Sequence, residues 1–291
     1  MIRITPEGDV HIFLTTDNNY APYVKVTINS LLCNCNLNYR YDIIILCINI
    51  EKEQKESILT VLEKHGNAQI RFFDVEEYMG DLNNLPVNGY LTWATYSRLL
   101  VFSELFENYE KIIYLDSDVI VEGDISNLFF TDMENKPLAA VEELGFRQLS
   151  FSKKAVFLDR NKPFNIDNYR MYGLGMKNPK EYFNAGVILF NLVKCRESIH
   201  MGDVKRVLSK HIYHYNDQDV LNILFDGNVK LLDTEWNYEN CVDVFLSIRP
   251  NIYGSIYEDV KRTSPKIIHY VSARKPWNCE VALDEYYHKY E

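Results

Sequence analysis

The sequence predicts an α/β fold with a mostly parallel central sheet flanked by helices. Short runs rich in β-branched residues alternate with longer helical patterns over the first 120 residues. The strand-like runs are also almost continuously apolar, as expected for parallel strands that are buried on both faces. A length of 291 residues with 47% hydrophobic residues is sufficient for one large domain with a substantial core.

The predicted elements of the first half follow one another without long gaps. The strands are residues 10–16 (VHIFLTT), 41–50 (YDIIILCINI), 70–75 (IRFFDV) and 112–116 (IIYLD), and the helices are residues 22–32, 52–64 and 94–105. Ligands of such sheets bind at the carboxyl ends of the strands. We therefore expect functional side chains directly after these strands.

The second half is less regular. Residues 151–180 are polar and rich in Asn, Lys and Pro, which predicts a long irregular insertion of the kind that often covers a site. Order returns in residues 182–192 (YFNAGVILFNL), in a helix from about Asp203, in residues 216–225 (NDQDVLNILF) and in residues 266–271 (KIIHYV). Without an internal repeat or a linker, residues 1–291 read as one domain.

The composition excludes several classes of protein. Lys and Arg number 31 against 41 Asp and Glu, and the net charge of −10 argues against a nucleic-acid partner. No apolar run approaches the ~20 residues that span a bilayer, and the N-terminus lacks the apolar core of a secretory signal. The six cysteines show no CxxC spacing. We therefore expect reduced thiols and a cytoplasmic protein, with peripheral contact at the inner face of the membrane left open.

Two aspartates interrupt an apolar run in IIYLDSDVIV. Asp116 and Asp118 have the i, i+2 spacing that places side chains on one side of an extended chain, so both carboxylates can converge on one cation. A hard divalent ion, Mg²⁺ or Mn²⁺, would offset their mutual repulsion. The spacing alone is weak, because Asp217 and Asp219 form a second D-x-D triplet. Phosphatases of the haloacid dehalogenase type, with Asp116 as nucleophile, and nucleotide-sugar transferases both use such a pair.

Six segments together point to one family: TTDNNYAPYV, TYSRLL, YLDSDVIV, YFNAGVILFNL, NDQDVLN and HYVSARKPW. In this order they cover nearly the whole chain. The sequence resembles glycosyltransferase family 8, the retaining group that includes bacterial lipopolysaccharide galactosyl- and glucosyltransferases and glycogenin. The resemblance implies a GT-A fold, which is Rossmann-like, with a nucleotide-binding half of about residues 1–125 and an acceptor- and sugar-binding half of about residues 126–291.

The resemblance also implies a UDP-sugar donor and a bound Mn²⁺ or Mg²⁺. His269 would complete the metal ligands with Asp116 and Asp118, and Lys275 would contact phosphate. Arg98, a guanidinium inside an apolar pattern, would face the diphosphate and sugar, or alternatively form a structural ion pair with Asp116.

Four residues near the end of the first strand would bind the nucleoside: Thr15, Asp17, Asn19 and Tyr20. Asp17 and Asn19 would hydrogen-bond uracil and ribose, and Tyr20 would stack on the base. The alternative is a polar turn that caps the next helix.

On the sugar side, the resemblance assigns Asn184, Ala185, Asp217 and Gln218 to the transferred sugar, with Gln218 facing the reacting carbon. Their alternative roles are a turn at Asn184 and a helix cap at Asp217. Glu142 would read sugar hydroxyls. Because Gln218 is a neutral amide and a poor nucleophile, we favour front-face displacement over a double displacement that uses Asp217.

The predicted activity is metal-dependent transfer of glucose or galactose from UDP, with α-linkage, to a saccharide, lipid-linked or protein-linked glycan. Alternatives are an inactive nucleotide-sugar-binding subunit and the phosphatase that uses Asp116. Two positions depart from the family pattern: Ser272 stands where a glycine is usual, and Tyr90 where some relatives have histidine.

Overall fold

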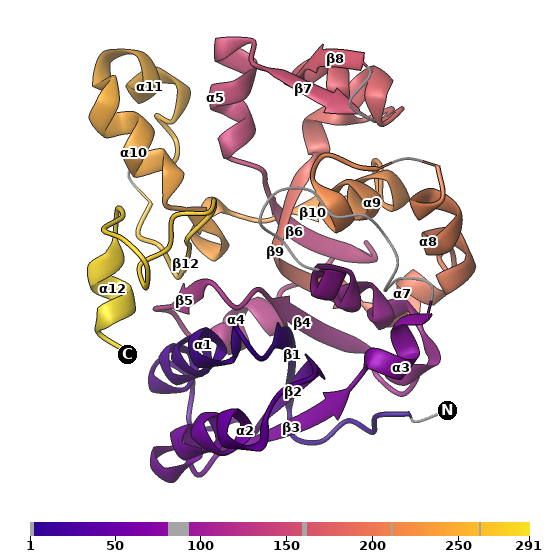
Figure 1. Cartoon of the computed structure of the whole chain (residues 1–291), viewed down its shortest axis with the longest axis vertical. Coiled ribbons are helices and arrows are strands. Elements are labelled where there is room, and N and C mark those ends of the chain that lie inside the picture. The colour runs from indigo at the N-terminus through magenta and orange to yellow at the C-terminus, as the bar shows by residue number, and fades with distance from the viewer. Residues whose placement is uncertain (1–2, 81–92, 159–161, 211, 262) are drawn as a thin grey trace.

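The computed structural model describes residues 3–80, 93–158, 162–210, 212–261 and 263–291. Its centre is a seven-stranded sheet with the order β10-β6-β9-β4-β1-β2-β3 (Figure 1). Only β9 runs antiparallel to its neighbours, β4 and β6, so the predicted mostly parallel sheet is confirmed. The strands are β1 (Val10–Asp17), β2 (Tyr41–Ile48), β3 (Ala68–Asp74), β4 (Lys111–Leu115), β6 (Leu138–Glu142), β9 (Phe183–Asn191) and β10 (Val229–Leu231).

Both faces of this sheet are covered. Alternate side chains of β1 enter opposite cores: Phe13 packs with the cluster that includes Leu99 and Val220, whereas Ile12 and Leu14 pack with the cluster that includes Val24. All eight residues of β2 are buried. The almost unbroken apolar runs of the sequence are thus explained by strands with no solvent-facing side.

The helices of the first half lie close to their predicted ranges. They are α1 (Ala21–Cys33), α2 (Lys52–Leu59), which continues as a 3₁₀ turn over Thr60–Lys64, α3 (Glu76–Met79) and α4 (Ile125–Phe129).

The predicted helix over 94–105 is not an α-helix. It consists of two 3₁₀ segments, Trp93–Phe102 and Glu104–Phe106. A 3₁₀ helix places residues three apart above one another. Thr95 and Arg98 therefore lie on the same side, and the Arg98 Nε donates to the Thr95 carbonyl.

A second, three-stranded sheet joins distant parts of the chain. It consists of β11 (Tyr238–Glu239), β12 (Ile267–His269) and β5 (Val119–Val121), in that order. β5 leaves the large sheet after β4 and pairs antiparallel with β12, so that Val119 faces His269. This pairing carries residues near 269 to the end of β4.

The region 151–180 is more ordered than the sequence predicts. It holds the hairpin of β7 (Ala155–Leu158) and β8 (Lys162–Asn165), the helix α6 (Ile166–Asn168), a π turn over Tyr169–Gly173 and the start of a 3₁₀ turn over Pro179–Glu181. The remaining helices are α5 (Gly145–Ser152), α7 (Leu192–Arg196), α8 (Met201–Leu208), α9 (Asn216–Leu224), α10 (Cys241–Ile248), α11 (Pro250–Ile256), α12 (Asp284–His288) and a 3₁₀ turn over Thr234–Trp236.

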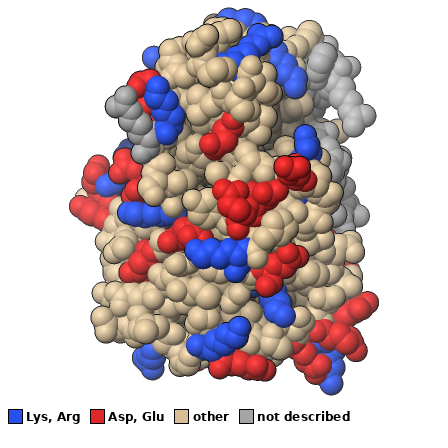
Figure 2. Space-filling model, turned by 90° about the vertical axis from the view of Figure 1, so that its left-hand side faces the viewer, with Lys and Arg blue, Asp and Glu red and all other residues tan. Residues whose placement is uncertain are grey.

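The surface and the thiols agree with the composition. Figure 2 shows acidic and basic side chains interspersed over the described part of one face. All six cysteines are free thiols. Among the described residues, no helix combines the length and apolar character needed to cross a membrane.

Candidate active site

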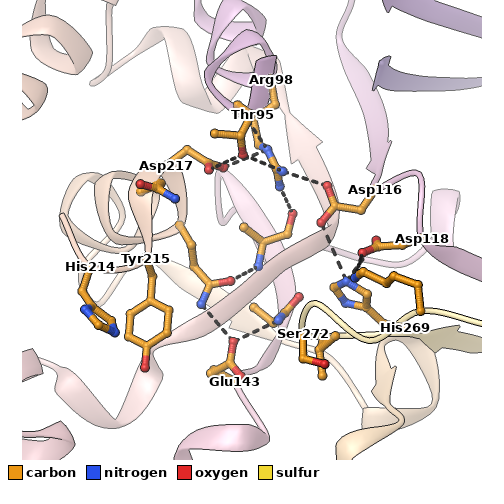
Figure 3. Close-up of a pocket in the computed structure, with 16 residues that line it drawn as sticks. Thr95, Arg98, Asp116, Asp118, Glu143, His214, Tyr215, Asp217, His269 and Ser272 are labelled. Atoms are coloured by element: carbon orange, nitrogen blue, oxygen red, sulfur yellow. Dashed lines mark hydrogen bonds and ion pairs between the residues drawn. The ribbon is translucent and has the colours of Figure 1, made fainter. Parts of the chain in front are cut away.

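A cavity of about 430 Å³ opens where the two sheets meet (Figure 3). Its walls come from the turn after β4, from β9, from the start of α9 and from the segment after β12. The sequence predicts site residues in each of these segments. Those that line the cavity are Arg98, Asp116, Asp118, Asn184, Ala185, Asp217, Gln218, His269 and Lys275.

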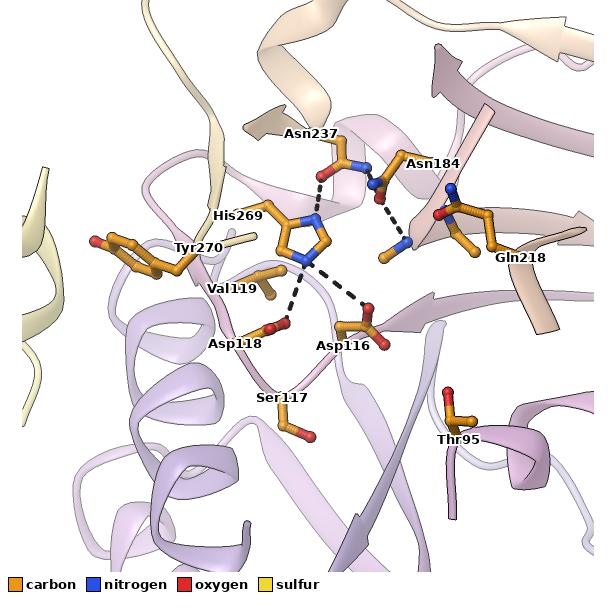
Figure 4. Close-up of polar contacts among 12 residues, drawn as sticks. Thr95, Asp116, Ser117, Asp118, Val119, Asn184, Gln218, Asn237, His269 and Tyr270 are labelled. Carbon is orange, nitrogen blue, oxygen red and sulfur yellow. Dashed lines mark hydrogen bonds and ion pairs between the residues drawn. The ribbon is translucent and has the colours of Figure 1, made fainter. Parts of the chain in front are cut away.

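Asp116, Asp118 and His269 form a cluster in which one ligand atom from each lies within 4.8 Å of the others. The His269 Nε2 is 3.3 Å from Asp118 Oδ1 and 3.8 Å from Asp116 Oδ2 (Figure 4). The two aspartates flank a turn between β4 and β5 instead of lying on one extended strand, so the strand argument for their convergence is wrong. Ser117 between them donates its hydroxyl to the Thr15 carbonyl, which fixes the turn against the end of β1.

A hydrogen-bond chain fixes the tautomer of His269. Asn237 directs its Nδ2 to the Asn184 Oδ1 at 2.9 Å, so its own Oδ1 faces the His269 Nδ1 at 3.0 Å. The Nδ1 must then carry a proton, which leaves the Nε2, between the two carboxylates, as the ring atom that can bind a cation. Asp118 Oδ1 is buried and accepts no hydrogen bond within the described part of the chain. Three lone-pair atoms converging in this way suit a cation.

Lys275 is one of two basic residues that neutralise the acidic groups, and Arg98 is the other. Lys275 donates to Asp118 Oδ2 and to the Tyr270 carbonyl, and its side chain is buried. Burial by itself would raise the pKa of Asp118, but Lys275 and His269 together outweigh burial and hold this pKa well below its usual range.

Arg98 joins two carboxylates from opposite walls. It pairs with Asp116 Oδ1 through Nη2 and with Asp217 Oδ2 through Nε, both at 2.8 Å. It also donates to the Ala185 carbonyl at 2.7 Å, and its guanidinium lies 4.4 Å from the centre of the Tyr114 ring. Arg98 thus forms the ion pair with Asp116 that the sequence analysis named, and it also lines the cavity. Burial would lower the pKa of Arg98, yet the two aspartates raise it above its usual value.

The side-chain amides of Gln218 and Asn184 point toward Glu143, which was not predicted as a site residue from the sequence. The Gln218 Nε2 and the Asn184 Nδ2 both donate to Glu143 Oε2 at 2.9 Å, and the Ala185 N–H donates to the Gln218 Oε1 at 2.9 Å. The prediction for the neighbouring Glu142 is wrong, because its carboxylate pairs with Arg147 outside the cavity. Glu142 was chosen from the family resemblance, and the pairing of β6 with β9 shifts register between Ala140 and Glu142, directly before Glu143.

Comparison with known proteins identifies the family. The sequence model of Glycosyl transferase family 8 matches residues 11–280. The chain belongs to glycosyltransferase family 8. Membership in this family rules out the phosphatase alternative.

Family 8 relatives and solved structures agree with the fold. The chain is 27% identical to a lipopolysaccharide 1,2-glucosyltransferase of Escherichia coli K12, over 96% of this chain and 75% of the relative. It is 28% identical to a glycosyltransferase described as putative in Haemophilus influenzae, over 79% of this chain and 63% of that relative.

Two solved structures resemble this one closely. The bifunctional glycosyltransferase WbbM in its apo form has a TM-score of 0.86 and 28% identity, over 99% of this chain and 50% of WbbM. The galactosyltransferase LgtC in complex with donor and acceptor sugar analogues has a TM-score of 0.74 and 25% identity, over 96% and 94% of the two chains. The predicted GT-A fold is confirmed.

The four residues predicted to bind the nucleoside lie at or directly after the end of β1, outside the cavity lining. Asp17 Oδ1 accepts the N–H groups of Asn19 and Tyr20 at 3.0 Å, so the predicted polar turn ahead of α1 is present, but no side chain caps the helix. The Thr15 hydroxyl hydrogen-bonds the Tyr114 hydroxyl. Tyr20 packs edge-on against Trp277, and burial together with the charge of Asp118 raises its pKa to about 12.

Of the two positions that depart from the family 8 pattern, Ser272 lies among the described residues. Ser272 lines the cavity and has φ +82°, a backbone conformation that favours glycine. The usual glycine at this position therefore has a backbone reason, and this chain keeps the shape with a serine. Tyr90 lies outside the described residues.

Proposed function

We propose that this protein is a metal-dependent retaining hexosyltransferase. It transfers glucose or galactose from UDP to a saccharide, lipid-linked or protein-linked glycan in α-linkage, with Mn²⁺ or Mg²⁺ as cofactor. The observation that carries the proposal is the set of three lone-pair atoms of Asp116, Asp118 and His269 within 4.8 Å, in a cavity that also holds Arg98 and Lys275. The oxygen and nitrogen donors suit a hard or borderline divalent ion.

The residues of the cavity have different roles in the proposed reaction. When bound, the divalent cation supplies Lewis-acid stabilisation of the negative charge on the departing diphosphate. Lys275 and Arg98 add fixed positive charge close to the same place. Thr15, Asp17, Asn19 and Tyr20 would hold the uridine beside this site, with Tyr20 offering a ring already supported by Trp277.

The geometry favours front-face displacement over a covalent intermediate on Asp217. Both Asp217 oxygens are engaged, Oδ1 with the Thr95 hydroxyl at 2.7 Å and Oδ2 with Arg98. In the favoured step the bond between the anomeric carbon and the phosphate oxygen breaks, and the acceptor hydroxyl forms the new bond on the vacated face. The hydroxyl proton passes to the departing phosphate, so no protein base is consumed.

The proposal extends to the setting of the reaction. A glycan or lipopolysaccharide acceptor is supported by the similarity to a lipopolysaccharide glucosyltransferase. A cytoplasmic location, with peripheral contact at the inner face of the membrane, remains the prediction made from the sequence.

Release of UDP is the direct test. We expect UDP release from UDP-glucose or UDP-galactose in the presence of Mn²⁺, and its loss after chelation. NMR of the glycosylated product should show the α configuration, and a β product would contradict retention. No release from either donor, combined with tight UDP binding, would favour the alternative of a non-catalytic binding subunit.

A glycine beside His269 provides a test of the metal cluster. A Cβ at Gly186 would lie 2.3 Å from the His269 Cε1 and 2.6 Å from its Nδ1. Gly186→Ala should therefore displace the imidazole from Asn237 and reduce Mn²⁺ affinity by about 10–100-fold, the usual cost of disturbing an outer-shell partner. Electron paramagnetic resonance of free Mn²⁺ measures this affinity.

The matched control is Gly254→Ala in α11, where an added Cβ meets nothing within 4 Å. This variant should bind Mn²⁺ as the unmodified protein does. Equal Mn²⁺ affinity in both variants would show that His269 is not a ligand.

A further inference from the structure

A pair of glutamates, Glu143 and Glu239, lies behind the sugar side of the cavity. Glu143 lines the cavity, whereas Glu239 is fully buried. Glu239 accepts the N–H groups of Leu144 at 2.8 Å and Gly145 at 3.0 Å, which fixes its carboxyl group at the start of α5. A Cβ on Gly145 would lie 3.0 Å from Glu143 Oε1 and 3.5 Å from Glu239 Oε2, so both carboxyl groups crowd the same small space.

Two carboxylates in such proximity do not both ionise. Burial raises the pKa of Glu239 well above its usual value, and the charge of Glu143 and its hydrogen bond to Glu239 raise it further. Glu143 lies at the edge of the cavity, where its Oε2 accepts two side-chain amide N–H groups. A carboxylate only accepts hydrogen bonds, which determines how its neighbours must turn.

Glu143 orients the side-chain amides of both Gln218 and Asn184. The Gln218 Nε2 and the Asn184 Nδ2 donate to Glu143 Oε2. Each amide oxygen must then point the other way: Gln218 Oε1 accepts from the Ala185 N–H, and Asn184 Oδ1 accepts from the Gly186 N–H at 2.8 Å. Through Asn237 the same chain of hydrogen bonds continues to His269.

We propose that Glu143 is a positioning residue that sets the amide orientation of Gln218 and Asn184 for glycosyl transfer. The inference rests on the proposed function for its kinetic consequence. Without Glu143, the Gln218 Nε2 keeps only its 3.4 Å contact with the Tyr182 hydroxyl, so the amide is less firmly held and the group that faces the reacting carbon is misplaced. Glu239 does not itself line the cavity.

The test compares three variants in the UDP-release assay with Mn²⁺. Glu143→Ala should lower kcat by about 100-fold, the cost typical of a misplaced catalytic group. The donor KM should stay within about threefold, because only a transition-state interaction is lost. Glu143→Gln should recover kcat to within about tenfold of the unmodified protein, since its carbonyl oxygen can still accept from both amides.

Glu142→Ala is the matched control, because this neighbouring carboxylate pairs with Arg147 outside the cavity. It should leave kcat unchanged. A kcat of Glu143→Ala within about threefold of the unmodified protein would overturn the proposal. Failure of Glu143→Gln to exceed Glu143→Ala would also overturn it, because a hydrogen-bonding role predicts rescue.

A second readout separates this inference from the proposed function. The side-chain amide signal of Gln218 in ¹⁵N–¹H NMR spectra, assigned by its loss in Gln218→Ala, should shift in Glu143→Ala and stay in place in Glu142→Ala. If the unmodified protein releases no UDP from any donor, the proposed function fails, yet this signal still reports on the orientation of Gln218. An unmoved signal in Glu143→Ala would overturn the positioning role by itself.

Discussion

Replacing Asp118 by asparagine is expected to lower metal-dependent turnover by at least about 10³-fold, since Lewis-acid stabilisation of the leaving group contributes several kcal/mol. Asparagine keeps the size of the side chain and one oxygen that can accept from Lys275, so the fold should persist. The substitution removes the charge next to the His269 Nε2 at 3.3 Å. The cluster then has one carboxylate in place of two.

The measurement pairs UDP release with a Mn²⁺ titration. Chelation should bring the unmodified protein down to the level of Asp118→Asn, and added Mn²⁺ should restore only the unmodified protein. Glu122→Gln, an acid-to-amide change at an ion pair with Lys289 directly after β5, serves as the control and should retain turnover. An Asp118→Asn variant that keeps a tenth or more of the turnover would refute the metal cluster as the catalytic centre.

The second large effect concerns stability. Arg98→Met should lower the free energy of unfolding by about 3–5 kcal/mol, because removing one member of a buried ion network leaves uncompensated charge. The Arg98 side chain is 9% exposed and that of Asp217 is 5% exposed. Burial already raises the pKa of Asp217, and Arg98 opposes that rise. Loss of the guanidinium therefore leaves Asp217 as a buried carboxyl group without its cation.

Urea denaturation at neutral pH measures the change. A second substitution, Asp217→Asn, should restore part of the lost stability in the Arg98→Met background, because it removes the uncompensated charge. Arg3→Met, at an exposed pair with Glu107, should cost no more than about 1 kcal/mol. A loss below about 1 kcal/mol in Arg98→Met would mean that the carboxylates find other partners.

The sequence predicts the sheet and the position of the Asp116–Asp118 pair well because each has a local signal. The apolar runs of β1 and β2 mark buried strands, and the D-x-D triplet follows the fourth strand of the sheet directly. The third member, His269, was linked to the pair by family resemblance alone. In the structure the link is physical, since β12 pairs with β5.

What the sequence missed depends on contacts between distant segments. Glu143 lines the cavity from the position directly after β6, beside a register shift in the pairing of β6 with β9. Glu239 and Asn237 lie in or beside β11, a strand of two residues that has no detectable hydrophobic period. The 3₁₀ winding of residues 93–102 also escapes an argument based on helical periodicity. The one sequence signal that could have drawn attention to Glu239 is the presence of an acidic residue in the stretch WNYEN.

The small sheet of β5, β12 and β11 has a consequence for the growing polypeptide. Until residues 267–275 have been synthesised, a nascent chain that already contains Asp116 and Asp118 lacks both His269 and Lys275. By residue 231 all strands of the large sheet have been synthesised, and Arg98 is present to pair with Asp116, yet Asp118 still lacks the imidazole of His269 and the charge of Lys275. The complete set of side chains is therefore present only at a late stage of translation.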